Sequence, residues 1–311
     1  MRMKIILGQF PYLWKRLGVP VYGTAFTLAL LRRKLAESRL DYKIPLHEID
    51  FNVAYEFGSL SVELVQLTHS VPDPAALVLR TEKGTILHTG DWKFDATPML
   101  GKDTDRERLR QIGDEGVMAL IGDSTNAMVN GYTPSEAVAR QGLTDVIAEA
   151  EGLVAVTCFA SNVARLKSII AAAVSNNRSV CVVGRALNRT IGAARDTGYL
   201  TDIPDFVSES EVSLIPRDHM VVICTGSQGE TRAAMAKIAA GVHESVELQP
   251  GDTVIYSSRQ IPGNEPAITK VQDMLVRRGI CLITDEDRPV HVSGHPARDE
   301  LVEMYGLVRP Q

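Results

Sequence analysis

Histidine and aspartate side chains follow two strand-like segments in the first third of the chain. His69 lies in LTHSVPD, after a stretch that alternates apolar and polar residues, and Asp91 lies in LHTGDWKFD after another strand-like stretch. Both side chains could therefore converge at one edge of a sheet. Imidazole and carboxylate ligands suit zinc or manganese. Because two ligands do not make a tight site, a turn histidine and a helix-capping or turn aspartate remain open as alternatives.

The segment HVSGH, near the end of the chain, is a candidate anion site. It places His291 and His295 four residues apart around Ser293 and Gly294. Such a loop could wrap an anion with a backbone amide, a hydroxyl and two imidazoles. Spacing alone gives weak specificity, and His291 could instead be a packing histidine.

Two further polar turns are candidates for a site. Asp123, in GDSTNA, follows a strand-like segment and could add a carboxylate to a site or simply cap the next turn. TGSQGE is a small polar turn of the kind that is more often just a tight connection. The sequence contains no GxxxxGK[ST] loop, which disfavours a generic nucleotide-binding α/β protein.

The elements that position these residues fall into two patterns. The first part of the chain is a series of strands with short links, and TPSE supplies an N-cap, a proline and a capping-box acid for a helix from about Pro134 to Glu151. The strands expected before that helix are Ser59–Leu67, Ala75–Arg80, Thr85–Thr89 and Val117–Ile121.

From Leu153 onward, strands and helices alternate strictly, which predicts a compact parallel α/β unit. Its strands are LVAVTC, SVCVVG, MVVICTG, DTVIYSS and ICLIT, with helices from about Asn162, Asn188, Thr231 and Asn264. Ligands bind beyond the carboxyl ends of such strands, so the loops FASN, GRALN, TGSQGE and SSRQIPGNE are the first place to look for a phosphate site. After Asp287, a short strand in PVHVSGH and a helix from about Ala297 indicate a return to another sheet. We therefore expect one domain inserted into another.

Charge and composition narrow the function classes. The formal net charge is -5, so the whole surface does not attract nucleic acid as a strongly basic domain would. Residues 152–195 contain no Asp or Glu but six basic residues, which could form a local basic face or merely solvated helix surfaces. These residues are Arg165, Lys167, Arg178, Arg185, Arg189 and Arg195. The apolar runs are too short or too broken for a membrane segment, and none is expected.

The cysteines give no sign of a metal or redox motif. Cys158, Cys181, Cys224 and Cys281 stand singly in apolar runs, with no CxxC spacing. We expect buried, reduced thiols in a cytoplasmic protein.

Taken together, the motifs LTHSVPD, HTGDWKFD, GDSTNA, FASNVARL, TGSQGE, IPGNE and HVSGH resemble the ribonuclease J family in order and approximate spacing. The resemblance runs from about Leu7 to Pro310. It implies an α/β protein: an incomplete metallo-β-lactamase αββα sandwich at residues 1–151 and 287–311, with an inserted β-CASP parallel α/β domain at residues 152–286. It also implies hydrolysis of RNA phosphodiester bonds, both internally and from a 5′ monophosphate end.

The resemblance assigns roles to particular residues. His69 and Asp91 would be metal ligands, with Asp91 bridging two divalent ions, zinc or manganese, because two neighbouring cations need shared negative charge. Asp91 and His295 would be catalytic, His295 by stabilising or protonating the reacting phosphate. RNA phosphate would be bound by Ser161, Asn162, His291, Val292, Ser293, Gly294 and His295.

The sequence departs from the family at its start. The family's HxHxDH motif falls on Met1, Met3, Ile5 and Ile6, which cannot replace imidazole or carboxylate ligands. From the resemblance we expect missing sandwich strands, a missing later histidine and a missing C-terminal domain, and hence impaired catalysis and exposed apolar faces. The alternative function is a non-catalytic RNA-binding fragment or subunit that pairs with an intact homologue. A homo-oligomer is one assembly that we consider. Related nucleases that act on DNA share the same phosphodiester chemistry, so a DNA substrate stays open as an alternative.

Overall fold

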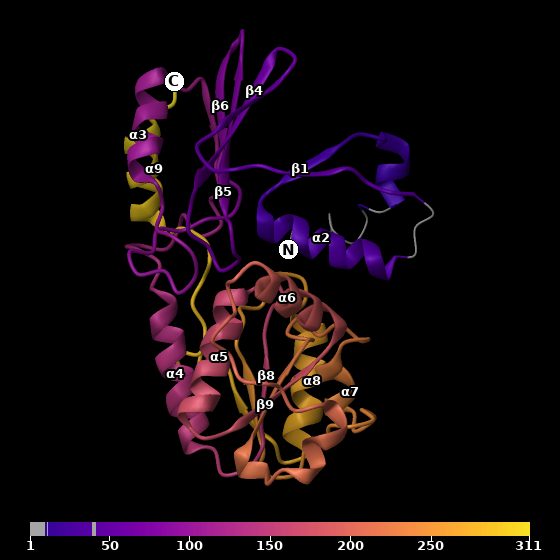
Figure 1. The fold of residues 1–311 in the computed structure, drawn as a ribbon. Helices are drawn as coiled ribbons and strands as arrows, with labels where there is room; N and C mark the ends of the chain where they lie inside the picture. The colour runs from indigo at the N-terminus through magenta and orange to yellow at the C-terminus, as the bar shows by residue number, and fades with distance from the viewer. Residues whose placement is uncertain (1–9, 11, 39–41) are drawn as a thin grey trace. The chain divides into compact units, whose positions relative to one another are not determined.

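The computed structural model describes residues 10, 12–38 and 42–311, which divide into two compact units (Figure 1). Unit 1 contains the chain up to Ser135 together with Ala193–Tyr199 and Ser293–Gln311. Unit 2 contains Glu136–Gly192 and Leu200–Val292. The chain thus leaves unit 1, builds unit 2 and returns to unit 1.

Unit 1 is built on a five-stranded sheet in the order β3-β4-β5-β6-β7. Its neighbours are antiparallel except β6 and β7, which are parallel. The strands are β3 (Ala54–Phe57), β4 (Leu60–Gln66), β5 (Ala75–Thr81), β6 (Gly84–His88) and β7 (Ala119–Ile121). All four strands predicted in this region are present, the last of them two residues shorter than expected. A small parallel pair, β1 (Val21–Gly23) with β2 (Leu46–Glu48), and helix α2 (Ala25–Glu37) precede the sheet along the chain.

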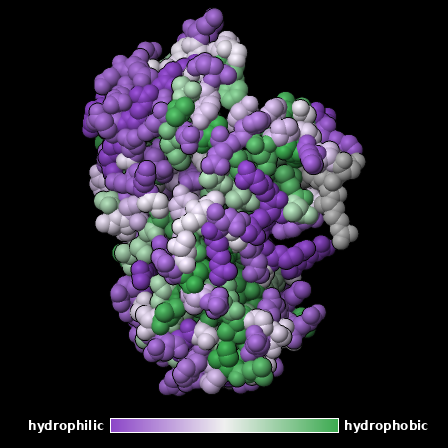
Figure 2. Space-filling view, viewed as in Figure 1, coloured by the Kyte–Doolittle hydropathy of each residue, from purple (hydrophilic) through white to green (hydrophobic). Residues whose placement is uncertain are grey.

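One face of the unit 1 sheet is covered by α3 (Arg106–Glu115) and α9 (Arg298–Val308). The shared core contains Val65, Val78, Leu87, Leu109, Ile112, Met304 and Val308. Figure 2 shows hydrophilic residues gathered over α3 and α9, as expected for helices that bury a single apolar face. On the opposite sheet face Val62, Leu79 and Ile86 stand side by side in register and are only partly buried among the described residues.

A buried charge cluster ties the sheet of unit 1 to α3. Glu63, on β4, is only 2% exposed and accepts hydrogen bonds from Arg108 at 2.6 and 2.9 Å and from Arg80 at 2.8 Å. Burial alone would raise the pKa of Glu63, but the two arginines outweigh it and lower that pKa.

Unit 2 is a five-stranded, fully parallel sheet in the order β12-β11-β8-β10-β9. Its strands are β8 (Val154–Thr157), β9 (Ser179–Val183), β10 (Met220–Cys224), β11 (Thr253–Tyr256) and β12 (Cys281–Ile283). Every residue of β8, β10 and β11 is buried, because helices cover both faces of the sheet. Each strand coincides with a predicted apolar run, so the parallel α/β prediction is confirmed.

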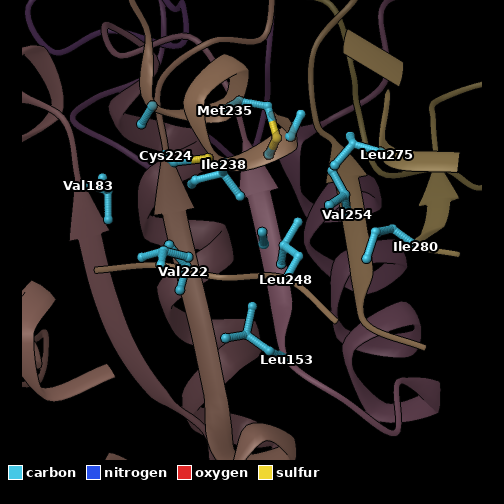
Figure 3. Close-up of a cluster of buried hydrophobic side chains, with 14 of the residues drawn as sticks. Leu153, Val183, Val222, Cys224, Met235, Ile238, Leu248, Val254, Leu275 and Ile280 are labelled. Carbon is cyan, nitrogen blue, oxygen red and sulfur yellow. The ribbon is translucent and has the colours of Figure 1, made fainter. Parts of the chain in front are cut away.

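The helices of unit 2 lie on both sides of its sheet, with α4 and α5 on one side and α7 and α8 on the other (Figure 1). They are α4 (Glu136–Glu149), α5 (Val163–Ser175), α6 (Arg185–Asp196), α7 (Ala234–Ala239) and α8 (Glu265–Arg277), with short 3-10 turns at Glu209–Leu214 and Arg217–His219. The last turn of α6 belongs to unit 1. Figure 3 shows the core on one face of the sheet, where Val222 and Val254 lie with Met235, Ile238 and Leu275 of α7 and α8.

Three predicted element bounds were wrong. The helix expected from Pro134 begins at Glu136, and the Glu136 carboxylate binds Arg165 and Ser168. The helix expected from Thr231 is the six-residue α7 and begins only at Ala234. α6 begins three residues earlier than expected, at Arg185.

The strand expected in PVHVSGH is also absent: residues 289–295 have no sheet partner. Side chains bind their backbone instead. The Ser257 hydroxyl donates to the Val290 carbonyl at 2.7 Å, and the Thr133 hydroxyl donates to the His295 carbonyl at 2.7 Å. When side chains bind the backbone groups of a short segment in this way, those groups do not need hydrogen bonds to a neighbouring strand.

Two surface expectations are corrected as well. Arg165 and Arg178 of the acid-free window are buried, Arg165 in an ion pair and Arg178 on backbone carbonyls, so the basic face loses two of its six members. Cys281 is exposed on the edge strand β12, whereas the other three cysteines are buried, and all four are free thiols. In the described part of the chain, no helix is both long and apolar enough to span a bilayer.

Candidate active site

Asp91, Asp123 and His295 converge in unit 1. Each offers one ligand atom, and these atoms all lie within 4.8 Å of one another. Asp91 follows β6 and Asp123 follows β7, and these strands are parallel neighbours, so their carboxyl ends deliver the two carboxylates to one sheet edge. His295 comes from the loop before α9. The structure therefore brings together Asp91 and His295, to which the resemblance gave catalytic roles, with Asp123 as a third member.

The pair His295 and Asp123 is held by a short hydrogen bond. His295 Nδ1 donates to Asp123 Oδ2 at 2.5 Å, and this bond raises the pKa of His295. Burial alone would raise the pKa of Asp123, but hydrogen bonds from His295 and Thr125 outweigh it and lower that pKa to about 2. Asp123 also closes the turn by accepting from the backbone and hydroxyl of Thr125, which is one of the two roles considered for it. With Nδ1 so engaged, Nε2 is the atom through which His295 can act.

His69 lies beside this group, with its ring centroid 5.8 Å from that of His295. Its Nδ1 donates to the Gly294 carbonyl at 2.7 Å, which leaves the Nε2 lone pair as the ligand atom. Burial lowers the pKa of His69 to about 4, so the ring is neutral at neutral pH. Metal-binding histidines commonly donate their second ring nitrogen to a carbonyl in this way.

Gly294 allows that close approach. A Cβ at this position would lie 2.4 Å from His69 Cε1 and 2.7 Å from His69 Nδ1. Any other residue would have to move the imidazole, so the glycine of HVSGH is required by packing rather than by a positive φ.

Asn126 and Thr133 fix the loop that carries His295. The Asn126 amide donates to Ser293 Oγ at 2.8 Å and to the His295 carbonyl at 3.2 Å. Thr133 donates to the same carbonyl, and Ser293 Oγ accepts from the His295 amide at 3.1 Å. In the sequence, Asn126 was noted only as part of the motif GDSTNA, and its role in fixing this loop was not predicted.

Glu300 was also missed. It is fully buried, and its carboxylate accepts backbone N–H groups from Phe94 at 2.6 Å, Ala297 at 2.7 Å and Thr133 at 2.8 Å. Along the chain, these three donors lie close to Asp91, to His295 and to the start of α4, respectively. The available signal was the acid three residues after Ala297, which is capping-box spacing for α9.

The other predicted phosphate-binding residues lie in unit 2. Asn162 is the N-cap of α5: its side chain accepts from the Arg165 amide at 2.8 Å. Ser161 precedes it and is partly exposed, at the carboxyl side of β8 where the sequence pattern predicted an anion site. His291 and Val292 contact Arg165, His291 through Nδ1 at 3.0 Å and Val292 through its carbonyl at 3.4 Å.

The donor set of unit 1 fits a divalent metal. Two carboxylates and the neutral His69, with His295 beside them, are the nitrogen and oxygen ligands that zinc and manganese accept. The four positions that match the family's HxHxDH motif, Met1, Met3, Ile5 and Ile6, lie outside the described residues.

Comparisons with known proteins find similarity to ribonuclease J. A family described as "Ribonuclease J, beta-CASP domain" matches residues 151–275. Ribonuclease J of Sinorhizobium meliloti is 48% identical over 98% of this chain and 54% of its own length. Ribonuclease J of Mycolicibacterium smegmatis is 41% identical and Ribonuclease J2 of Bacillus subtilis 39% identical, each over 98% of this chain and 55% of its own length. The chain thus spans about half the length of the curated relatives it matches.

A solved structure supports the fold alone. The crystal structure of a protein of unknown function from Enterococcus faecalis V583 superposes with a TM-score of 0.64 and 18% sequence identity, covering 94% of this chain and 68% of that one. The predicted fold class is confirmed: the chain is α/β and contains a β-CASP domain, and its homologues imply a metallo-β-lactamase fold.

Proposed function

We propose that this chain, whose residues 151–275 match the β-CASP domain of ribonuclease J and which is 48% identical to one curated ribonuclease J, is a metal-dependent hydrolase of RNA phosphodiester bonds. The observation that carries the proposal is the group Asp91, Asp123 and His295 within 4.8 Å, with the neutral His69 beside it. In this proposal residues 1–151 and 287–311 form the metallo-β-lactamase core and residues 152–286 the inserted domain.

His69 and Asp91 are the residues that would hold divalent zinc or manganese, and the negative charge of Asp91 would be available to two neighbouring ions. When bound, the ions lower the pKa of a water and stabilise the leaving oxygen. The chain's own part is to hold His69 through the Gly294 carbonyl, so that the ring needs little reorganisation to bind.

His295 is the proposed proton donor or electrostatic stabiliser at the reacting phosphate, and with Asp91 it forms the catalytic pair. Asp123 orients His295 and stabilises its protonated form, which keeps a proton available at Nε2. Asn126 and Thr133 hold the His295 carbonyl and thereby the ring's position.

RNA phosphate, including a 5′ monophosphate, is the proposed ligand of a second set of residues. These are Ser161, Asn162, His291, Val292, Ser293, Gly294 and His295. Ser161 brings a hydroxyl to the N-terminus of α5, where backbone amides and the helix dipole favour an anion. We further propose a cytoplasmic protein, and a homo-oligomer as one assembly to test.

The test is cleavage of a 5′-monophosphorylated RNA by the chain, with and without EDTA. We expect cleavage in the presence of a divalent metal and none in the presence of EDTA. The variant Asp91→Asn should abolish cleavage, while Asp50→Asn, a change at an exposed aspartate of the same unit, should not.

A different outcome would favour the alternative function. RNA binding that survives EDTA and depends on the 5′ phosphate, without cleavage under any metal, would identify a non-catalytic RNA-binding subunit.

A further inference from the structure

Arg165, on α5, is a fully buried guanidinium whose described partners all lie in unit 2. It binds Glu136 bidentately, with Nε at 2.6 Å from Oε1 and Nη2 at 3.0 Å from Oε2. Ser168 adds a hydroxyl to the same carboxylate at 3.0 Å. A buried charge is tolerated only when it is paired in this way. The ion pair with Glu136 therefore balances the charge of Arg165, and the remaining N–H groups of the guanidinium can donate hydrogen bonds to other residues.

Those contacts hold the segment that leads into HVSGH. Arg165 Nη1 lies 2.9 Å from Ser257 Oγ, 3.0 Å from the Ser257 carbonyl and 3.3 Å from the Val290 carbonyl. The Ser257 hydroxyl donates to the Val290 carbonyl as well. The backbone before His291 is thus fixed by two buried side chains.

The same Nη1 lies 3.0 Å from His291 Nδ1. A guanidinium carries only donors, so Nδ1 must be the acceptor. A proton on Nδ1 would face an N–H of Arg165 and lose this hydrogen bond. Neutral His291 must then carry its proton on Nε2.

We propose that Arg165 is a positioning residue that holds His291 in the Nε2–H tautomer, so that the ring presents a hydrogen-bond donor to a phosphate oxygen. The identity of the ligand depends on the proposed function, in which His291 contacts RNA phosphate. The assignment of the tautomer depends only on the contact between Arg165 and His291. Because Glu136 balances the charge of Arg165, the guanidinium orients the ring rather than attracting the anion itself.

The test is nitrogen NMR of the chain with labelled histidine and arginine, with His291 assigned through His291→Gln. We expect Nδ1 of His291 at the shift of an unprotonated ring nitrogen and Nε2 at that of a protonated one. The double variant Glu136→Gln with Arg165→Met removes the donor without leaving a buried charge, and the two tautomers should then mix. Arg178→Met, which removes another buried guanidinium of unit 2 that donates to the backbone carbonyls of Ala150 and Gly152, should leave His291 unchanged.

A protonated Nδ1 in the native chain overturns the proposal, and so does an unchanged tautomer in the double variant. If the double variant does not fold, a through-hydrogen-bond coupling between Arg165 Nη1 and His291 Nδ1 in the native chain decides the point: its presence supports the contact and its absence overturns it.

Inorganic phosphate and a 5′-monophosphorylated RNA then test the ligand. Both should shift the His291 Nε2 resonance, and the double variant should bind the RNA about twofold more weakly, because mixing of the tautomers leaves only about half of the rings with their proton on Nε2. If the tautomer is as proposed but neither probe affects His291, the phosphate part of the proposal fails together with the role given to His291 above, while the positioning role of Arg165 stands.

Discussion

Replacing Gly294 with alanine should damage the metal centre through a single contact. The added Cβ would lie 2.4 Å from His69 Cε1, whereas carbon atoms pack at about 3.5–4.0 Å, so the ring or the loop must move by about 1 Å. That shift breaks the hydrogen bond from His69 Nδ1 to the Gly294 carbonyl. Loss of such a supporting contact typically weakens metal binding about 10–100-fold. Overpacking should also cost about 1–3 kcal/mol of stability.

Calorimetric titration of zinc or manganese into Gly294→Ala measures the affinity, and denaturant unfolding measures the stability. Gly306→Ala is the matched control, because no atom lies within 4 Å of a Cβ at that helical position. It should leave metal affinity unchanged and gain about 0.5–1 kcal/mol in stability, as Gly to Ala changes in helices do. Equal metal affinity in both variants would refute the role given to the contact between Gly294 and His69.

Three further outcomes are expected. Glu300→Gln should lower the free energy of unfolding, measured by urea titration, by about 2–4 kcal/mol, because an amide cannot accept all three backbone N–H groups. Asp299→Asn, at the exposed start of α9, is the control and should leave the free energy of unfolding nearly unchanged. The folded-state pKa of Glu63 lies below its ordinary value of 4.5, so the stability that its ionised carboxylate contributes is complete above pH 4.5 and is lost as the pH falls through the folded-state pKa. Glu63→Gln should therefore be less stable than the native chain at neutral pH but lose less stability on acidification. Parallel pH profiles of the melting temperature for the two proteins would contradict this. Iodoacetamide should alkylate Cys281 before the three buried cysteines, as mass spectrometry of timed samples can check.

Apolar periodicity carried most of the fold prediction. The buried strands of unit 2 are continuous apolar runs, and their order along the chain with helices between them allows only a parallel sheet. The sequence placed His69 and Asp91 after strands, whose ends deliver side chains to a sheet edge, but the contact of His69 with Gly294 came only from the structure.

Buried polar partnerships were not predictable from local patterns. Glu136 has the sequence position of a capping-box acid, yet Arg165, 29 residues later, takes its carboxylate. Glu300 and Asn126 act on loops more than 160 residues away, at separations that no window of sequence describes. The same holds for residues 289–295, where buried side chains such as Ser257 replace the strand partner that alternation suggested.

Metal content of the purified chain tests the central claim most directly. Elemental analysis after dialysis against zinc or manganese should find bound metal in the native chain and in Asp50→Asn, with loss of that metal in Asp91→Asn and His69→Gln. A native chain that retains no metal, or an Asp91→Asn variant that retains as much as the native chain, would contradict the assignment of this cluster as a metal centre.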